Sequence, residues 1–187
     1  DKLQGKTNYR DDSYIFRSQF QSFLNKSSNI IFGLEMSLDR SKSNVLRNIY
    51  TQPNQNTTAG FAQFRKQLSK EFLFDLGLRY DLRKVTGGEG YSIKTFNAFS
   101  PKITLLYNIN KFFNTNISIN RGFRAPSISE LFLEYESSYG LLLKGNPNVK
   151  EESLTSIDIG IKYQNQDNFS FFSNLFFNSY KNMIDFI

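Results

Sequence analysis

The sequence predicts an all-β protein: the wall of an antiparallel transmembrane β-barrel, to which the chain contributes about eight strands. Three observations support this prediction: long segments that alternate apolar with polar residues, connections that alternate between short and long, and the lack of any long apolar run. A membrane-spanning helix needs about 20 mostly apolar residues, and none of the 187 residues lie in such a segment. A barrel strand needs only about 9 to 11 alternating residues, so a mean hydropathy of -0.45 is compatible with a membrane protein.

Four strands are predicted in the first half of the chain, at residues 14–23, 29–40, 57–68 and 71–83. The fourth has the clearest period of two, which is typical of a strand with one apolar and one polar face. Its apolar face consists of Phe72, Phe74, Leu76, Leu78, Tyr80 and Leu82. The pattern is weaker in the first segment, and the second and third carry apolar residues on both faces. Strands in soluble sandwiches are usually about five or six residues long, so the length of 71–83 favours a tilted barrel strand.

Four more strands are predicted at residues 101–107, 113–121, 153–163 and 169–182. Alternation is clear in the first three of these, where isoleucine, leucine and tyrosine share one face and asparagine, serine, aspartate and lysine share the other. The last segment carries apolar residues on both faces. The chain therefore contains eight candidate strands.

The connections between these strands alternate without exception between short and long. The short ones are 24–28, 69–70, 109–111 and 164–168, and the long ones are 41–56, 84–98 and 125–152. Outer-membrane barrels have short periplasmic turns at one end and long extracellular loops at the other. A soluble β-sandwich, which is the alternative fold, usually mixes loop lengths at both ends.

Tyrosines lie near several predicted strand ends, where their amphipathic rings favour a membrane interface. They are Tyr14, Tyr80, Tyr107, Tyr163 and Tyr180. The alternative explanation is that tyrosine is simply common in strands.

The composition argues against catalysis. The chain has no cysteine and no histidine, which excludes thiolate sites, histidine triads and histidine-based metal or haem ligation within it. We therefore expect no enzyme activity, no cofactor and no metal site. The net charge is +6, but the basic residues are dispersed rather than clustered, so we expect solvated faces and no nucleic-acid partner.

Two linked motifs lie within residues 120–154. The first is Arg-Gly-Phe-Arg-Ala-Pro at 121–126, and the second is Gly-Asn-Pro-Asn-Val at 145–149, followed by Glu152. This combination resembles the TonB-dependent outer-membrane receptors, whose barrels carry an equivalent pair of motifs followed by a new strand. Alternating strands on both sides of the motifs fit the resemblance, which covers most of the chain.

The chain departs from the family pattern at three points. Val149 replaces the usual leucine, and Glu151 stands where a proline often precedes the glutamate. Haem-uptake members commonly carry a histidine between the two motifs, whereas this interval contains Tyr135 and Tyr139 instead. The missing histidine argues against haem as the ligand, although tyrosine can ligate haem iron.

The resemblance implies that residues 1–187 are an internal fragment of a 22-stranded barrel in the bacterial outer membrane, without the plug domain and the remaining strands. It implies TonB-dependent uptake of a scarce nutrient, such as an iron–siderophore complex, by capture on extracellular loops and plug-gated passage. The implied partners are outer-membrane lipid and lipopolysaccharide, the protein's own plug, TonB and a small-molecule nutrient. Polar faces including Asp75, Arg79, Asp158 and Lys162 would then line the lumen.

Two other functions are considered beside uptake. A closed eight-stranded barrel with a structural or anchoring role would have an interior just wide enough for side chains. Pairing of the first strand with the eighth would distinguish it from part of a larger barrel. An outer-membrane protease or lipase is disfavoured because such enzymes use histidine.

The first motif supplies the candidates Arg124 and Glu130. By strand parity Arg121 faces lipid, where a charge costs about 2 to 4 kcal/mol at the bilayer centre but about 0 to 1 near the interface, so we expect it at or above the outer interface. Arg124 has the opposite parity and should point into the lumen, and Pro126 should end the strand. Arg124 and Glu130 either form an internal ion pair that steadies the loop or contact the plug or ligand.

The remaining candidates are Asn146, Asn148, Tyr135 and Tyr139. The two asparagines flank a proline, which is a strong turn signal, and they are ligand candidates because a loop over a pore mouth meets the ligand first. The two tyrosines would form an aromatic lid, or the loop would pack on itself.

Overall fold

The computed structural model is dominated by eight long antiparallel strands and describes residues 9–43, 53–87, 93–136, 140, 142–165 and 169–185. The long strands are β1 (Tyr9–Asn25), β2 (Ser28–Ser43), β3 (Asn54–Gln67), β4 (Phe72–Thr86), β5 (Lys94–Asn108), β6 (Phe113–Arg124), β9 (Glu152–Gln164) and β10 (Ser170–Lys181). Each coincides with one of the eight predicted segments, which extend at most one residue beyond their strands, so the prediction of eight strands is confirmed. The insertion between β6 and β9 holds the helix α1 (Ile128–Phe132) and the short strands β7 (Glu134–Glu136) and β8 (Leu142–Lys144).

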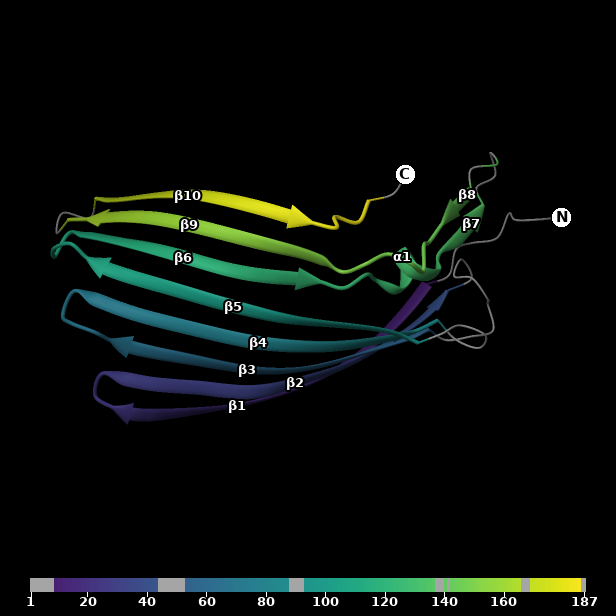
Figure 1. Ribbon diagram of the computed structural model, residues 1–187, viewed down its shortest axis with the longest axis horizontal. Helices are drawn as coiled ribbons and strands as arrows, with labels where there is room; N and C mark the ends of the chain where they lie inside the picture. Colours follow the sequence, from purple (N-terminus) through teal and green to yellow (C-terminus); the bar gives the residue numbers. More distant parts are fainter. Residues whose placement is uncertain are drawn as a thin grey trace.

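The eight strands form one open sheet in the order β1-β2-β3-β4-β5-β6-β9-β10. Chain neighbours pair throughout, apart from the inserted hairpin β7-β8, and Figure 1 shows the strands side by side from β1 to β10. The outermost strands do not pair with each other: among the described residues β1 pairs only with β2, and β10 only with β9. The alternative of a small closed eight-stranded barrel is therefore wrong, because both edges still present unpaired backbone groups.

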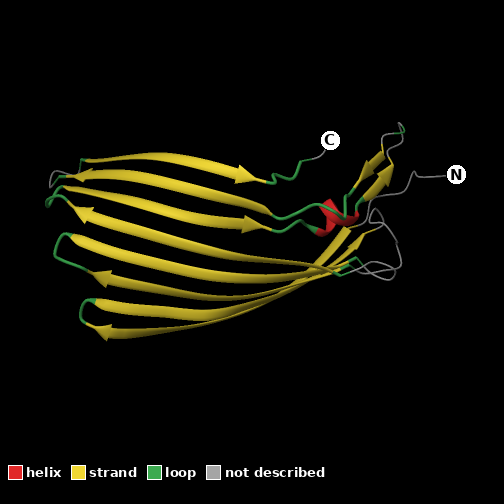
Figure 2. Ribbon diagram, in the orientation of Figure 1, coloured by secondary structure: helices red, strands yellow, loops and turns green. Residues whose placement is uncertain are grey.

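Short and long connections lie at opposite ends of the sheet (Figure 2). In the turn before β6, the Asn110 Oδ1 accepts hydrogen bonds from the amides of Phe112 and Phe113, a compact side-chain turn that asparagine favours. In the turn before β4, the Ser69 hydroxyl accepts from the amides of Glu71 and Phe72. The predicted alternation of connections is thus confirmed, and the layout is that of an outer-membrane barrel wall.

Two of the predicted long connections were too long. β4 continues to Thr86 and β5 begins at Lys94, so most of the loop predicted at 84–98 is strand. Val85 and Phe96 in these extensions are buried against residues of the β6–β9 insertion. Alternation in these stretches is hard to recognise because the apolar partner is remote in sequence. The loop predicted at 41–56 is shortened in the same way, since β2 reaches Ser43 and β3 starts at Asn54.

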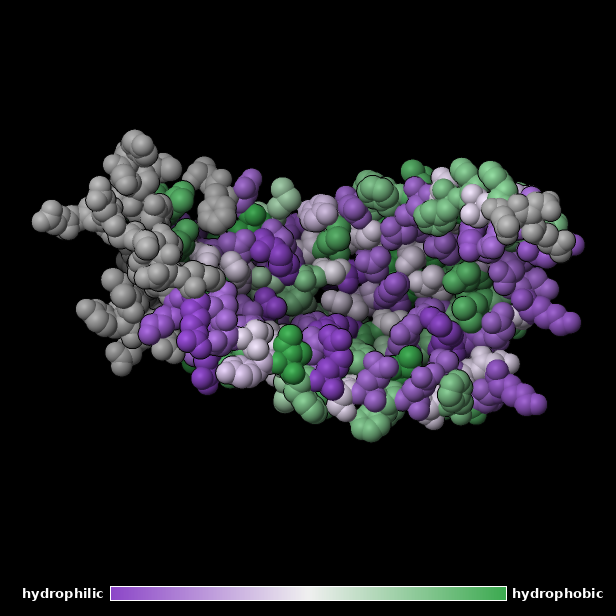
Figure 3. Space-filling model, turned by 180° about the vertical axis from the view of Figure 1, so that it is seen from behind, coloured by the Kyte–Doolittle hydropathy of each residue, from purple (hydrophilic) through white to green (hydrophobic). Residues whose placement is uncertain are grey.

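The two faces of the sheet differ in chemistry. One face carries large exposed apolar side chains, including Phe16, Phe32, Leu78, Ile117 and Leu175. The other is mainly polar, although it also carries Ile15, Phe172 and Phe176, and its polar side chains reach across neighbouring strands. Seen from behind, hydrophilic side chains run along the sheet, interrupted by a few hydrophobic ones, and hydrophobic side chains project at the upper and lower margins (Figure 3). The apolar face suits lipid and the polar face suits an aqueous lumen.

Ion pairs connect the strands on the polar face. Arg79 on β4 contacts both Asp81, at 2.8 Å, and Glu35 on β2, at 3.2 Å. Glu35 also pairs with Arg17 on β1. The contact between β2 and β4 passes over β3 at the small residue Ala59, which is 1% exposed. Side chains from next-nearest strands can meet in this way where the sheet is concave, so this face is the luminal one.

Aromatic side chains gather at the turn end of the apolar face. The rings of Phe72 and Tyr107 stack with their centroids 4.4 Å apart, and those of Phe113 and Tyr163 are 4.6 Å apart. Tyr107 and Tyr163 therefore lie at strand ends as predicted, and their position at a membrane interface stays a prediction. The other three predicted tyrosines differ. Tyr14 and Tyr80 lie several residues inside strands that are longer than expected. Tyr180 lies on the luminal side, because its partner Leu154 has the same parity as the luminal residue Glu152.

The helical content is small. The described part of the chain contains a single helix, and its five residues cannot cross a membrane.

Gly33 on the luminal face of β2 should tolerate no side chain. A Cβ there would lie 2.3 Å from the carbonyl oxygen of Ser18 and 2.7 Å from the ring of Phe61. We expect Gly33→Ala to lower the free energy of unfolding of the complete protein in detergent micelles by about 1 to 3 kcal/mol, the usual cost of overpacking. Urea unfolding followed by circular dichroism measures this change.

The matched control is Gly60→Ala on β3. A Cβ at Gly60 meets nothing closer than the Leu34 Cδ2 at 3.7 Å, so this variant should unfold at nearly the same urea concentration as the wild type. Equal loss of stability in both variants would contradict the close contact at Gly33.

Candidate functional site

The predicted site residues lie in the insertion between β6 and β9, apart from Arg124, which is the last residue of β6. The insertion begins with α1, whose first turn is closed by a capping box: the Ser127 Oγ accepts from the Glu130 amide at 3.2 Å, and the Glu130 carboxylate accepts from the Ser127 amide at 2.7 Å. The long connection predicted at 125–152 contains this helix, which was not predicted. Serine followed three residues later by glutamate, just before apolar residues, is a readable helix-start signal, and it was overlooked.

α1 packs against the luminal face of the wall. Val85 on β4 and Phe96 on β5 meet apolar side chains of the insertion, and each member of this cluster is at most 7% exposed. The insertion contributes Ala125, Ile128, Leu131 and Phe132. The chain therefore turns inward after β6, and α1 lies at the loop end of the lumen (Figure 1).

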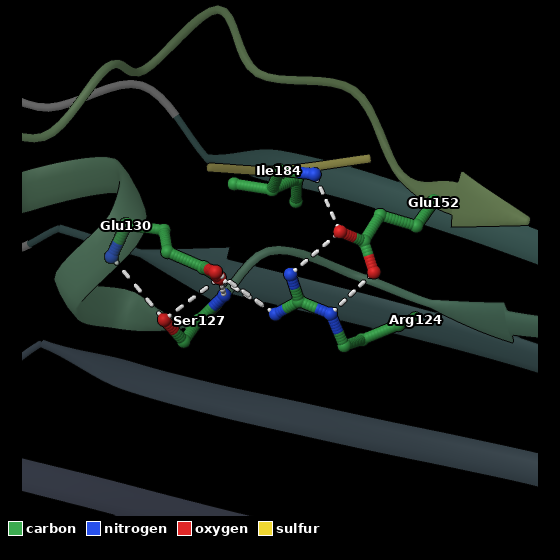
Figure 4. A network of polar contacts seen from close by, with 5 residues as sticks. All are labelled: Arg124, Ser127, Glu130, Glu152 and Ile184. Carbon is green, nitrogen blue, oxygen red and sulfur yellow. Dashed lines mark hydrogen bonds and ion pairs between the residues drawn. The ribbon is translucent and has the colours of Figure 1, made fainter. Parts of the chain in front are cut away.

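The Arg124 guanidinium joins the end of β6 to two carboxylates (Figure 4). Its Nε and Nη2 donate to the two oxygens of Glu152 at 2.7 and 2.9 Å, and its Nη1 donates to both oxygens of Glu130 at 2.9 Å. The glutamate side chains are only 13% and 14% exposed, against 45% for the arginine. The pair with Glu152 is bidentate, which adds geometric specificity as well as strength.

The Arg124–Glu130 ion pair predicted as one of two readings is present, and the predicted luminal parity of Arg124 is confirmed. The predicted end of the strand is also confirmed, because β6 stops at Arg124, two residues before Pro126. Glu152 was missed as the second partner. It stands directly opposite Arg124 in the β6–β9 register, which the sequence alone did not provide. Contact of Arg124 or Glu130 with a plug or ligand stays a prediction.

This cluster lies at the loop end of the wall, where β6 ends at Arg124 and β9 begins at Glu152, and it changes the pKa values of its members. Hydrogen bonds from Arg124, aided by the Ile184 amide, lower the pKa of Glu152 to about 2 despite its burial. Burial alone would raise the pKa of Glu130, but the Ser127 amide and Arg124 outweigh it and hold the pKa below its usual value. The hydrogen bonds that Arg124 donates to Glu152 chiefly raise the pKa of Arg124, against the opposing effect of burial. All three groups are therefore charged at neutral pH.

The second motif is held against the C-terminal end of α1. The Gly145 amide donates to the Leu133 carbonyl at 2.7 Å, and the Asn146 amide donates to the Glu130 carbonyl at 2.8 Å. A Cβ on Gly145 would lie 2.7 Å from backbone atoms of Leu131 and Phe132. Glycine is needed here because two backbone segments approach so closely.

The predicted Asn-Pro-Asn turn is confirmed. The Asn146 Oδ1 accepts from the Asn148 amide at 2.9 Å, and the Asn146 carbonyl accepts from the Val149 amide at 3.2 Å. Asn146 also lines a hollow of about 210 Å³, together with Glu130, Lys144 and Ile184. Asn148 is exposed and does not line this hollow.

Neither candidate tyrosine has a side chain that the structure describes. Tyr135 belongs to β7, where it stands opposite Leu143 of β8, and its side chain is not among those that the structure describes. Tyr139 lies outside the described residues. The aromatic lid therefore stays a prediction, as do ligand contacts by Asn146 and Asn148.

The arrangement suits binding. Arg124 with its two glutamates forms a cluster of net charge -1 at one side of the hollow, and Lys144 and Asp185 add one charge of each sign to the lining. In the described ranges, no three acidic side chains converge in a way that could hold a metal ion. What the site offers is a polar recess at the mouth of the lumen.

Comparison with known proteins decides the family. A family model described as "TonB dependent receptor-like, beta-barrel" matches residues 2–187. The chain belongs to the TonB-dependent receptor family. The sheet is therefore part of a barrel wall in a bacterial outer membrane, and its family consists of receptors and transporters rather than enzymes.

Individual relatives of this receptor chain are distant. It is 27% identical over 135 residues to the TonB-dependent heme receptor A of Haemophilus influenzae, covering 62% of the chain and 18% of that protein. It is 24% identical over 177 residues to the iron-regulated outer membrane virulence protein of Vibrio cholerae, covering 92% of the chain and 26% of that protein. The chain thus spans about a quarter or less of the length of these relatives.

Solved structures share the fold. The FrpB iron transporter of Neisseria meningitidis superposes with a TM-score of 0.75 at 15% identity, over 96% of this chain and 29% of that one. The siderophore receptor PirA of Pseudomonas aeruginosa also gives a TM-score of 0.75, at 17% identity, over 92% of this chain and 32% of that one. The open sheet is therefore a section of a larger barrel.

The acidity of Glu152 is testable. Its pKa in the folded receptor is lowered from about 4.5 to about 2, so its stabilising ion pair is complete above about pH 4.5 and is lost as the pH falls toward 2. Carbon-13 NMR of labelled glutamate in the complete receptor should show Glu152 titrating near pH 2.

The variant Arg124→Gln removes the main cause of this shift. We expect Glu152 to titrate closer to pH 4.5 in that variant. A Glu152 that titrates near pH 4.5 in the unchanged receptor would show that the bidentate pair does not form.

Gly145→Ala should detach the second motif from α1, because the new methyl group would overlap backbone atoms of Leu131 and Phe132. We expect proteases to cleave the insertion of the complete receptor at least about tenfold faster, as for a local opening made easier by about 1.4 kcal/mol. Gly122→Ala is the matched control, since a Cβ at Gly122 meets nothing within 4 Å. Unchanged cleavage of Gly145→Ala would argue against the tight backbone approach.

Proposed function

We propose that the complete protein is a receptor that takes up an iron-bearing small molecule across the outer membrane with energy relayed by TonB. The observation that carries this proposal is the inward-folded insertion, which places polar groups of Arg124, Glu130 and Asn146 at the loop end of the lumen. A ligand arriving from outside meets this end first. Names of the relatives support iron as cargo, since they include a heme receptor, an iron-regulated protein, an iron transporter and a siderophore receptor.

An iron–siderophore complex is the proposed cargo, in preference to haem. The chain has no histidine, and the interval between the motifs carries tyrosines where haem-uptake members commonly have that residue. A siderophore complex can be held by hydrogen bonds and charges from side chains without direct ligation of the iron. The net charge of +6 gives weak additional support for an anionic complex.

The plug and the remaining strands are proposed to come from other parts of the same protein. The unpaired edges of β1 and β10 require neighbouring strands in the membrane. The luminal wall is suited to a polar plug, since its arginines at 17, 65 and 79 are already neutralised by wall carboxylates. A plug surface would then need hydrogen-bonding groups more than matching charges.

Arg124→Ala in the complete receptor should reduce uptake of iron–siderophore complexes. Loss of the charge-assisted hydrogen bonds releases both Glu130 and Glu152, and this should lower uptake on the order of tenfold. Radioactive iron uptake by cells that express equal surface amounts of each receptor measures the effect.

Arg10→Ala is the control. Arg10 is also an exposed arginine in an ion pair, with Asp12 at 3.2 Å, but it lies on the outward face of β1. This variant should import iron at the wild-type rate. Full uptake by Arg124→Ala at normal surface level would remove the proposed role of the cluster, and an absence of TonB dependence would overturn the proposed function itself.

A further inference from the structure

A hollow of about 330 Å³ opens on the luminal face near the middle of strands β1 to β5. Gly77 on β4 lines it between Gln63 on β3 and Lys102 on β5, the two residues that stand opposite Gly77 in the register. A Cβ on Gly77 would meet nothing closer than the Lys102 Cβ, at 3.6 Å. Because Gly77 has no side chain, space is left between its neighbours, and we call this hollow the Gly77 recess.

Positive charge exceeds negative charge around the Gly77 recess. Three cations line it, Arg17, Arg79 and Lys102, against one carboxylate, Glu35. Glu35 pairs with both arginines, and Asp81 pairs with Arg79 from outside the lining. The two arginines and the two carboxylates therefore balance one another, and the charge of Lys102 remains.

Lys102 has no counter-charge of its own in the wall. It is exposed and forms no ion pair with another described residue. By register its nearest carboxylate is the diagonal neighbour Asp75, which is buried and does not line the recess. Gln63 donates to both oxygens of Asp75, at 2.9 and 2.8 Å, and Arg65 donates two further hydrogen bonds to its Oδ2. Asp75 is thus already satisfied by strand β3.

Hydrogen-bond donors surround the ammonium group of Lys102. Ser100 is the next luminal residue on β5, and Gln19 on β1 lines the same recess. In the described part of the chain, the side chains of Lys102, Ser100 and Gln19 have no hydrogen-bond partner. Arg79 uses Nε and Nη2 for its two carboxylates, which leaves the N–H groups of Nη1. A carboxylate only accepts hydrogen bonds and has roughly four sites for them, so it matches such a set of donors.

We propose that the Gly77 recess is a binding site for a carboxylate group that the wall does not supply. Lys102 provides the charge, Ser100 and Arg79 provide hydrogen bonds, and Gly77 provides the space. The carboxylate belongs to an anionic complex that passes through the lumen or to a side chain of the plug. The site itself follows from the luminal face alone, whereas passage of an imported complex over it rests on the proposed function.

Carbodiimide cross-linking of the complete receptor in outer-membrane vesicles tests the site. The carbodiimide activates a carboxylate, which forms an amide with an amine in contact with it, and the carbodiimide leaves as a urea. Peptide mass spectrometry identifies the carboxylate that is joined to Lys102. The reaction is run with and without citrate, a small tricarboxylate that serves as the free probe.

Lys162 is the matched control within the unchanged receptor. It is also an exposed luminal lysine without an ion pair to another described residue, but it stands opposite Asn114 and Phe172 and does not line the recess. We expect Lys102 to be linked at least about tenfold more often than Lys162, as hydrogen bonds to a charged group allow. A link to citrate identifies a free anion as the source, and a link to a plug peptide identifies the plug; either one supports the site.

Gly77→Leu fills the recess and removes no charge. We expect this variant to lower the yield of linked Lys102 at least about tenfold. Gly122→Leu is its control, because Gly122 is a luminal glycine outside the recess whose Cβ would meet nothing within 4 Å. That variant should link Lys102 within about twofold of the wild-type yield.

A link between Lys102 and Asp75 would overturn the proposal, because Lys102 would then belong to an ion pair within the wall. Equal yields at Lys102 and Lys162 would overturn it as well, and this comparison needs no variant to fold. A yield that Gly77→Leu leaves unchanged would have the same meaning. Iron uptake is not read in this experiment, so a failed link leaves the proposed transport function intact, and a loss of TonB dependence leaves the site intact.

Discussion

Lipid offers a peptide group no hydrogen-bond partner, and this constraint determines the architecture. Every N–H and C=O within the bilayer must pair with a neighbouring strand, so the chain forms a continuous ladder from β1 to β10. Pairing leaves only the side chains to distinguish the two environments. Because successive side chains point to opposite faces, one sequence can meet lipid at Leu78 and the lumen at Arg79.

The same constraint explains how much of the fold the sequence predicted. Residues 71–83 alternate between side chains that suit lipid and side chains that suit the lumen, so this strand was recognisable without any knowledge of its neighbours. The ends of strands were not, since Phe96 is buried only because α1 folds back over it. At the site, parity placed Arg124 correctly, and its ion pair with Glu130 was among the predicted readings. Glu152 required knowledge of which strand pairs with β6.

Arginines on the luminal wall and beside the insertion are each paired with carboxylates. An arginine within a barrel is expensive to leave unpaired where water is scarce, and Arg79 meets this by reaching Glu35 across Ala59. Arg124 does the same at the mouth with two carboxylates. In both places the carboxylate comes from a different element, so the ion pairs also fix the relative positions of strands and insertion.

Glu152 receives donors from two separate parts of the chain. Arg124 ends β6, just before the insertion, whereas the Ile184 amide belongs to the segment that follows β10. The Glu152 carboxylate thus connects the end of β6 to the segment that follows β10. Pulling either part outward removes donors from this carboxylate and loosens the hold on the other, so the two parts are mechanically coupled through a single side chain.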